Sequence, residues 1–367
     1  MSKILLIGDV HLGLGYPNRL DHFFNVTTEY FEKFLIPLIK RNITKDDIIV
    51  FLGDLFDNRS VVPINILNYA QTILETLSAI CPIHIIIGNH DIYNKSDNEI
   101  NSLKAYNYIP NIHVYETTTQ IEFNNKKILL MPWIDDKEAQ VALLQANAGC
   151  EYLFCHSDLN GARMHLTSVG HRNMNKIDVN DFGAYQHVYS GHIHLVQRNK
   201  NFTFAGSIHE MDRNDIDNQK GIFILDTDTD SELFIPNTIS PKFKKIYINK
   251  EEDIDLLDQD LTKDWIDLFI SNSLIVNNRK LRRKLETVLQ TGNFSTVEYI
   301  DDISIEEEVV DEVAVNENLT INLDYNEYIK NYILAQTYGT DKIKNGIVSE
   351  FENIIGIYNE SAKKNIN

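Results

Sequence analysis

Residues 4–11, Ile-Leu-Leu-Ile-Gly-Asp-Val-His, join a short apolar run to two polar side chains. Four more apolar runs end in the same way: 48–52 before Gly53-Asp54, 83–87 before Gly88-Asn89-His90-Asp91, 152–155 before His156, and 187–189 shortly before Gly191-His192-Ile193-His194. Apolar runs of this length predict buried strands. In open α/β sheets, ligands bind outside the carboxyl ends of the strands, so we expect the five segments to converge on one point.

The side chains at these strand ends are types that bind divalent metal ions: Asp9, His11, Asp54, Asn89, His156, His192 and His194. A pair of ions about 3.5–4 Å apart needs a bridging carboxylate and mixed ligands, and it activates a water for in-line attack on phosphorus. Carboxylate and amide oxygens suit Mn²⁺ or Mg²⁺, and the imidazoles shift the preference towards Mn²⁺, Fe or Zn. The three cysteines form no ligand-spaced pair, which argues against a thiolate site.

Each segment alone is a weak signal, because an Asp-x-His after a strand is more often a loop cap than a metal ligand. His192 and His194 alternate along an extended segment, so their side chains face the same way. The function prediction therefore depends on the whole set in its order along the chain.

That ordered set, D-x-H, G-D-x-x-D, G-N-H-D, H and G-H-x-H, resembles the motifs of the calcineurin-like metallophosphoesterases. Three flanking segments are similar to one branch of the family: GDLFD at 53–57, GHIH at 191–194, and FAGSIHEMD at 204–212, followed by a predicted strand at 220–225. This branch is the meiotic-recombination-eleven/SbcD-type DNA repair nucleases, which act with an SMC-like ATPase. In size and C-terminal portion the chain most resembles the nuclease subunits of T-even-type phages, and the resemblance covers nearly its whole length.

The resemblance implies an α/β fold, a two-sheet β-sandwich flanked by helices, and assigns roles to the strand-end residues. Asp9, His11, Asp54 and His194 would hold one ion, and Asp54, Asn89, His156 and His192 the other. His90 would donate a proton or hydrogen bond to the leaving oxygen, with Asp91 fixing its ring. Asp57 stands where related proteins often have His, so Arg59 is expected to make part of the phosphate contact. The implied partners are DNA, as double-strand ends or single strands, an SMC-like ATPase, and a second copy of the chain.

The chain divides into four predicted regions. Residues 1–240 form the nuclease domain, with amphipathic helices near 21–40 and 64–80. A strand over 267–276, a helix over 278–290 and a strand over 295–300 predict a small β-α-β unit, which matches the capping domain of the family within 241–300. Residues 301–322 form an acidic linker, and 323–367 form a helical region.

Two sets of residues are predicted to bind macromolecules. DNA contacts are expected at His209, which follows the Gly-Ser turn, and on the helix at 278–290, from Arg279, Lys280, Arg282 and Arg283. A solvated basic face is the alternative for this helix. Apolar stripes on two C-terminal helices predict ATPase docking through Tyr328, Ile329, Tyr332, Ile347, Phe351 and Ile354, with packing on the core as the alternative.

The net charge of −19 is unfavourable for a DNA-binding protein. Nine acidic side chains, with no Lys or Arg, lie between Glu298 and Thr320, so much of the acidity is concentrated in one segment. We expect weak DNA affinity for this chain alone, with the ATPase supplying much of the affinity for DNA.

The sequence has no apolar stretch of about 20 residues and no signal-peptide pattern. It therefore predicts a soluble cytoplasmic protein without a membrane partner. If a phage encodes the protein, this would be the host cytoplasm.

Two rival functions remain open at this level. The same metal ligands could serve a phosphatase or phosphodiesterase for small substrates, although such an enzyme would not need a capping unit and a helical tail. The chain could also be a scaffold of an ATPase complex with a vestigial metal site, but the complete ligand set argues against this.

Overall fold

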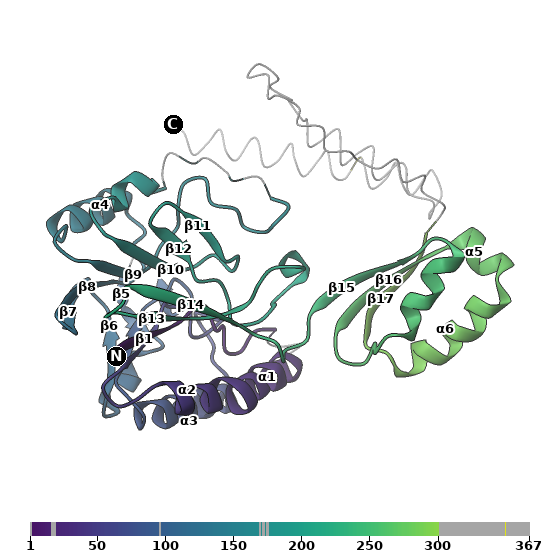
Figure 1. Cartoon of the computed structure of the whole chain (residues 1–367), viewed down its shortest axis with the longest axis horizontal. Coiled ribbons are helices and arrows are strands. Elements are labelled where there is room, and N and C mark those ends of the chain that lie inside the picture. The colour runs from purple at the N-terminus through teal and green to yellow at the C-terminus, as the bar shows by residue number, and fades with distance from the viewer. Residues whose placement is uncertain are drawn as a thin grey trace, which may run out of the picture. The chain divides into compact units, whose positions relative to one another are not determined.

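A computed structural model describes residues 2–15, 20–94, 97–168, 170, 173, 176–300 and 349 (Figure 1). In these residues the main body contains two six-stranded sheets and a two-stranded hairpin, and a three-stranded sheet follows towards the C-terminus. The mixed α/β class predicted from the sequence is confirmed.

The first sheet contains three of the five predicted strands. Its order is β14-β13-β1-β2-β3-β6, with bounds β1 Lys3–Ile7, β2 Ile48–Phe51, β3 Ile83–Ile86, β6 Ile112–Tyr115, β13 Gly221–Asp226 and β14 Ser231–Pro236. Strands β1, β2, β3 and β6 run parallel, whereas β13 pairs antiparallel with β1 and with β14. The carboxyl ends of β1, β2 and β3 therefore lie at one edge of the sheet.

The second sheet contains the other two predicted strands. Its order is β11-β12-β10-β9-β8-β7, with bounds β7 Thr119–Phe123, β8 Lys126–Met131, β9 Tyr152–His156, β10 His187–Gly191, β11 Gln197–Asn199 and β12 Phe202–Phe204. Strands β8, β9, β10 and β12 run parallel to one another.

The two sheets pack face to face around an apolar core. Along β1, Ile4 and Leu6 join the cluster between the sheets, which includes Phe154 and Tyr189 of the second sheet. The alternate residues of β1, such as Leu5, join the cluster beneath the helices. This period-2 alternation explains why the strand is apolar at every position: both of its faces are buried.

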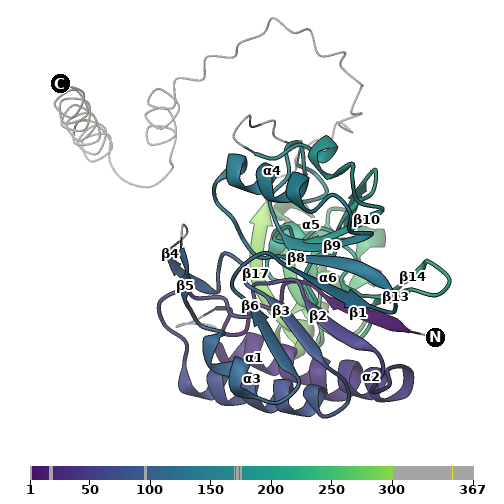
Figure 2. The same ribbon diagram turned by 90° about the vertical axis from the view of Figure 1, so that its left-hand side faces the viewer.

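Helices cover the outer faces of this sandwich. Helices α1 Leu20–Glu29, α2 Ile36–Asn42 and α3 Ile64–Ser78 lie on one side, and α4 Lys137–Ala146 lies on the other (Figures 1 and 2). Shorter elements of the main body are β4 Ile92–Asn94, β5 Asp97–Asn101, and the 3₁₀ turns η2 Lys104–Tyr108, η3 Val179–Phe182 and η4 Arg213–Asp215. The helix predicted over 21–40 contains a π-helical stretch, η1 Tyr30–Leu35, between α1 and α2.

The C-terminal sheet is parallel, with order β15-β16-β17 and bounds β15 Phe243–Ile248, β16 Trp265–Ser271 and β17 Phe294–Ile300. Its other elements are η5 Glu251–Asp258, α5 Asn272–Asn277 and α6 Arg279–Thr291, and one apolar cluster joins the sheet to these helices. The strand predicted over 267–276 is wrong in its second half. The hydroxyl of Ser271 accepts a hydrogen bond from the Leu274 N–H at 3.2 Å, and this cap starts helix α5 where the strand was expected to continue.

Most of the predicted linker and ATPase-binding region lies outside the described residues, including Tyr328, Ile329, Tyr332, Ile347, Phe351 and Ile354. Among the residues that the structure does describe, none of the helices has the length and apolar character needed to cross a membrane.

Candidate metal centre

The five strand-end segments meet in space, as the sequence predicts. Three of their residues have backbone conformations that are uncommon for side chains other than glycine: His11 and Asp54 have φ of 50°, and His192 has φ of 86°. Such conformations cost free energy and persist where the surrounding structure enforces them, and they cluster at functional sites.

One group of predicted ligands contains Asp9, His11, Asp54 and His194. Ligand atoms of the first three all lie within 4.8 Å of one another. The Nε2 atoms of His11 and His194 are 3.1 Å apart, and the His11 Nε2 is 3.7 Å from Asp54 Oδ2. Two imidazole nitrogens that face each other at this distance suit a shared ion, because both can then act as electron-pair donors.

The second group contains Asp54, Asn89, His156 and His192. The Asn89 Oδ1 atom is 2.9 Å from His156 Nε2 and 2.8 Å from His192 Nδ1, and Asp54 Oδ2 is 3.2 Å from His156 Nε2. The other ring nitrogen of His156, Nδ1, is 2.7 Å from the Leu52 carbonyl oxygen, which orients the ring. Asp54 therefore lies between the two groups.

The ionisable groups of the centre perturb one another strongly. Burial raises the pKa of Asp9, and the nearby His156 only partly opposes this effect. Burial also opposes ionisation of Asp54, but His156 and His11 beside it hold its pKa well below the usual range. Burial disfavours the charged form of His156, yet Asp54 and Asp9 raise its pKa to about 9.

These residues fit a divalent cation. The Asp9 side chain is fully buried, and its Oδ2 atom has no hydrogen-bond partner among the described residues. A buried carboxylate oxygen without a partner costs free energy that a bound cation would offset. The mixture of carboxylate, amide and imidazole donors suits divalent ions such as Mn²⁺, Mg²⁺, Fe or Zn, and it contains no thiolate.

Glycines allow the segments to approach this closely. A Cβ atom at Gly53, where φ is 96°, would lie 2.4 Å from His156 Nδ1. A Cβ atom at Gly88 would lie 2.2 Å from Asp54 Oδ1. Both positions require a residue without a side chain.

The support of His90 differs from the expectation. The Asp91 carboxylate accepts hydrogen bonds from the backbone N–H groups of Phe56, at 3.1 Å, and Gly88, at 2.9 Å, so it is occupied in shaping the loop. The His90 Nδ1 atom lies 2.6 Å from the carbonyl oxygen of Asp57 instead. Burial of the Asp91 carboxyl, reinforced by the nearby Asp54, raises its pKa to about 7.

Asp57 is a site residue whose role the sequence prediction missed. Its Oδ1 atom is 3.2 Å from His11 Nδ1, while its backbone carbonyl orients His90. A carboxylate that accepts the proton of one ring nitrogen leaves the other nitrogen for a metal. The only signal in the sequence is the second Asp of the GDLFD segment, at which the resemblance implies a lost phosphate contact.

Trp133 was also missed. Its ring centroid is 4.9 Å from that of His192, and it follows strand β8 at the same edge as the predicted ligands.

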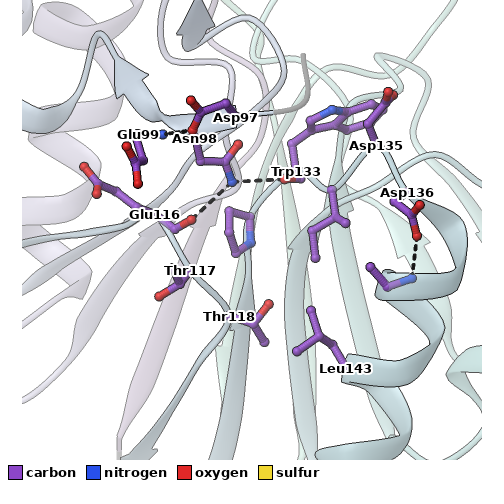
Figure 3. A pocket seen from close by; sticks show the side chains of 13 residues that line it. Asp97, Asn98, Glu99, Glu116, Thr117, Thr118, Trp133, Asp135, Asp136 and Leu143 are labelled. Carbon is purple, nitrogen blue, oxygen red and sulfur yellow. Dashed lines mark hydrogen bonds between the residues drawn. The ribbon is translucent and has the colours of Figure 1, made fainter. Parts of the chain in front are cut away.

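Trp133 also lines a cleft of about 880 Å³. Figure 3 shows that the Asn98 side chain bridges the walls of this cleft, because its amide donates to the carbonyl oxygens of Glu116 and Trp133, both at 3.1 Å. The other charged residues that line the cleft are Asp97, Glu99, Asp135 and Asp136. This acidic lining disfavours the binding of phosphate groups in the cleft.

The residues predicted to contact DNA differ in their exposure to solvent. His209 is buried, with Nε2 3.0 Å from the Thr27 hydroxyl and Nδ1 2.9 Å from the Glu210 carbonyl oxygen, so the prediction that it lines a DNA cleft is wrong. Arg59 is partly buried, two residues beyond Asp57.

The four basic residues predicted on helix α6, Arg279, Lys280, Arg282 and Arg283, are all exposed. The Arg282 guanidinium donates to the backbone carbonyls of Ile275, at 3.3 Å, and Val276, at 2.8 Å. Arg282 therefore satisfies carbonyl groups in the last turn of helix α5, and fewer of its N–H donors remain for a phosphate.

Comparisons with known proteins agree with the geometry. The sequence profile described as Calcineurin-like phosphoesterase matches residues 2–196. Exonuclease subunit 1 of Enterobacteria phage T4 is 26% identical over 334 residues, which cover 88% of this chain and 91% of the phage protein. Putative phosphoesterase 244L of Invertebrate iridescent virus 6 is 26% identical over 223 residues, covering 56% of this chain and 70% of the viral protein. A solved structure of an archaeal phosphodiesterase aligns at 12% identity and a TM-score of 0.32, over 64% of this chain and 99% of the other, a likeness too low to bear on function.

Proposed function

The chain belongs to the calcineurin-like phosphoesterase family, and from this premise we propose that it is a DNA nuclease that uses two divalent ions, with Mn²⁺ preferred over Mg²⁺. It would act as an exonuclease and as an endonuclease on single strands, in the processing of double-strand breaks and in recombination. The similarity to Exonuclease subunit 1 of phage T4 over most of both chains supports this substrate class.

The observation that carries the proposal is the position of Asp54. Its Oδ2 atom lies 3.7 Å from His11 Nε2 and 3.2 Å from His156 Nε2, so one carboxylate can serve both groups of ligands. Two ions held in this way would supply a nucleophile at neutral pH and neutralise the charge that develops on the phosphate oxygens.

His90 is proposed to exchange a proton with the substrate. Because its Nδ1 donates to the Asp57 carbonyl oxygen, its Nε2 is left for an oxygen of the substrate. Burial lowers the pKa of His90, and a phosphate bound beside the ring would favour the protonated form that donates to a leaving oxygen. His90 and Asp57 thus form one unit, with Asp91 acting on the loop backbone and not on the ring.

DNA binding is proposed to involve helix α6 and a partner. Arg279, Lys280 and Arg283 are exposed on one short helix, which supports phosphate contacts there. The strongly negative net charge supports the need for an SMC-like ATPase that adds DNA affinity.

A homodimer is also proposed. Ile64 and Leu67, at the start of helix α3, are 77% and 37% exposed, which is unusual for large apolar side chains. The viral relatives support action inside a host cell.

Hydrolysis of three substrates by the purified chain would test the proposal. Bis-p-nitrophenyl phosphate, linear duplex DNA and single-stranded DNA would be compared with Mn²⁺, with Mg²⁺ and with EDTA. The proposal expects metal-dependent turnover of all three. Turnover of the small ester without DNA cleavage would favour the small-substrate phosphodiesterase, and no turnover by a metal-loaded chain would favour the scaffold.

A further inference from the structure

Lys220 is a buried lysine next to the metal centre. Only 6% of its surface is exposed. Its ammonium donates to the backbone carbonyl of His194 at 2.8 Å and to the Ser207 hydroxyl at 2.8 Å, and it pairs with Asp215 Oδ1 at 2.5 Å. All three donor positions of the ammonium are therefore used within the protein.

Asp215 holds this ammonium from a rigid position. Its Oδ2 atom accepts from the Met211 N–H at 2.9 Å, and its Oδ1 atom also accepts from the Asn218 amide at 3.0 Å. Replacing a buried ion pair by apolar residues is often neutral or stabilising, so stability alone is a weak reason for this pair. The contacts of the Lys220–Asp215 pair indicate instead that it fixes the position of neighbouring backbone segments.

The groups held by Lys220 belong to two segments that carry metal ligands. The His194 carbonyl also accepts from the Ser207 N–H at 3.3 Å, which joins the His194 loop to the segment at 206–208. That segment in turn pairs with Asp9: the Asp9 N–H donates to the Gly206 carbonyl at 3.3 Å, and the Ile208 N–H donates to the Asp9 carbonyl at 3.2 Å. Lys220 thus joins the His194 backbone to Ser207, whose segment pairs in turn with the backbone of Asp9.

The turn that carries Asp215 is also fastened to the C-terminal sheet. Arg213, at the start of the same 3₁₀ turn η4, makes a bidentate pair with Asp267 of β16 at 2.5 and 2.8 Å, and donates to the Thr296 hydroxyl of β17 at 3.2 Å. Arg213 therefore contacts the C-terminal sheet, while Asp215, two residues later in the same turn, contacts Lys220 next to the metal centre.

We propose that Lys220 is a positioning residue for His194, that Asp215 is its anchor, and that Arg213 links this pair to the C-terminal sheet. The inference rests on the proposed two-metal site, because it takes His194 as a ligand. Loss of Lys220 would leave the His194 carbonyl with the longer hydrogen bond from the Ser207 N–H alone, and the weaker hold would let the His194 imidazole leave the position facing His11. Partners that orient a ligand in this way typically change metal affinity or activity by about 10–100-fold.

The first test measures Mn²⁺ binding by calorimetry for Lys220→Met and Asp215→Asn, with Arg198→Met as the matched control. Arg198 pairs with Glu232 of β14 in the first sheet and with the Thr203 hydroxyl of β12 in the second, and none of these partners is a proposed ligand. We expect both test variants to bind one Mn²⁺ about 10–100-fold more weakly and the control to bind both ions normally.

Hydrolysis of bis-p-nitrophenyl phosphate separates positioning from a structural role. A displaced ligand should raise the Mn²⁺ concentration that gives half-maximal rate, and excess Mn²⁺ should recover much of kcat with KM unchanged. If Lys220→Met does not fold, as judged by circular dichroism, Asp215→Asn carries the test. Wild-type Mn²⁺ affinity in a folded variant, or a loss of rate that excess Mn²⁺ does not recover, would overturn the assignment.

The second test addresses Arg213. We expect Arg213→Met to weaken Mn²⁺ binding in the same direction, and its effect to be non-additive with that of Lys220→Met, because both act through one turn. Additive effects, or an Arg213→Met variant indistinguishable from the Arg198→Met control, would overturn the link. A wild-type chain that binds Mn²⁺ and hydrolyses the small ester but does not cut DNA would refute the proposed nuclease function and leave this inference intact.

Discussion

Replacement of Gly88 by alanine should disable the metal centre without loss of the fold. The new Cβ atom would lie 2.2 Å from Asp54 Oδ1 and 2.3 Å from Asp54 N, whereas real Cβ contacts are essentially never shorter than 3.0 Å. Asp54 must therefore move by about 0.8 Å or more, and the backbone contact prevents a simple rotation of its side chain. Misplacement of a reacting group by about 1 Å can cost about 10²-fold in rate.

The assay is Mn²⁺-dependent hydrolysis of bis-p-nitrophenyl phosphate, with Mn²⁺ binding measured by calorimetry. Gly88→Ala should lower kcat by about 10²-fold and weaken binding of both ions, since Asp54 is the proposed bridge. Gly149→Ala is the matched control, because no heavy atom lies within 4 Å of a Cβ atom built there. A folded Gly88→Ala protein with the rate and Mn²⁺ affinity of this control would show that the position of Asp54 does not govern the centre.

Four other outcomes are expected. His90→Gln should slow DNA cleavage by about 10²–10⁴-fold with metal content unchanged by elemental analysis, and loss of metal would contradict its role as a proton donor. Burial raises the pKa of Glu210 from 4.5 to about 7, so the folded state retains a proton that the unfolded state releases, and the stability contributed by this group should be lost as the pH rises through this range. Calorimetric Tm should then fall more between pH 5 and 8 for the wild type than for Glu210→Gln, and equal falls would refute the assignment. Each bound Mn²⁺, at 100 times its Kd, should stabilise the fold by about 2.7 kcal/mol, seen as a Tm difference that EDTA abolishes. A chain ending at Ile303, the boundary of the compact unit, should remain folded and keep ester hydrolysis but lose calorimetric binding to the proposed SMC-like ATPase, and retained binding would contradict the proposed C-terminal docking.

The strands and the convergence of the ligands could be predicted because their signals are local. Each strand is a continuous apolar run, since both faces of a buried parallel strand are covered. The polar residues follow these runs directly, and parallel strands bring their ends to one edge. The edge of the first sheet therefore places Asp9, His11, Asp54 and Asn89 near one another, whereas the approach of the ligands from the second sheet was implied by the family resemblance.

The errors concern features that the sequence signal does not contain. Leu274, Ile275 and Val276 look like the end of a strand, but a capping hydroxyl at Ser271 overrides their propensity. His209 follows a turn and looks accessible, but its partner Thr27 lies 182 residues earlier in the chain. Whether Asp57 or Asp91 contacts a histidine ring depends on backbone direction within a loop, which residue spacing does not specify.

The central place of β1 in the first sheet has a consequence for the synthesis of the protein. β1 pairs with β2, which follows soon after, but its other neighbour, β13, begins only at Gly221. At typical elongation rates of about 5–20 residues per second, one edge of this apolar strand would wait roughly 10–40 s for its partner. During that time the nascent chain exposes an unpaired edge that is prone to aggregation. The N-terminal half should therefore depend on chaperones during translation, and a chain released after His194 but before Gly221 should be insoluble even though it contains every proposed metal ligand.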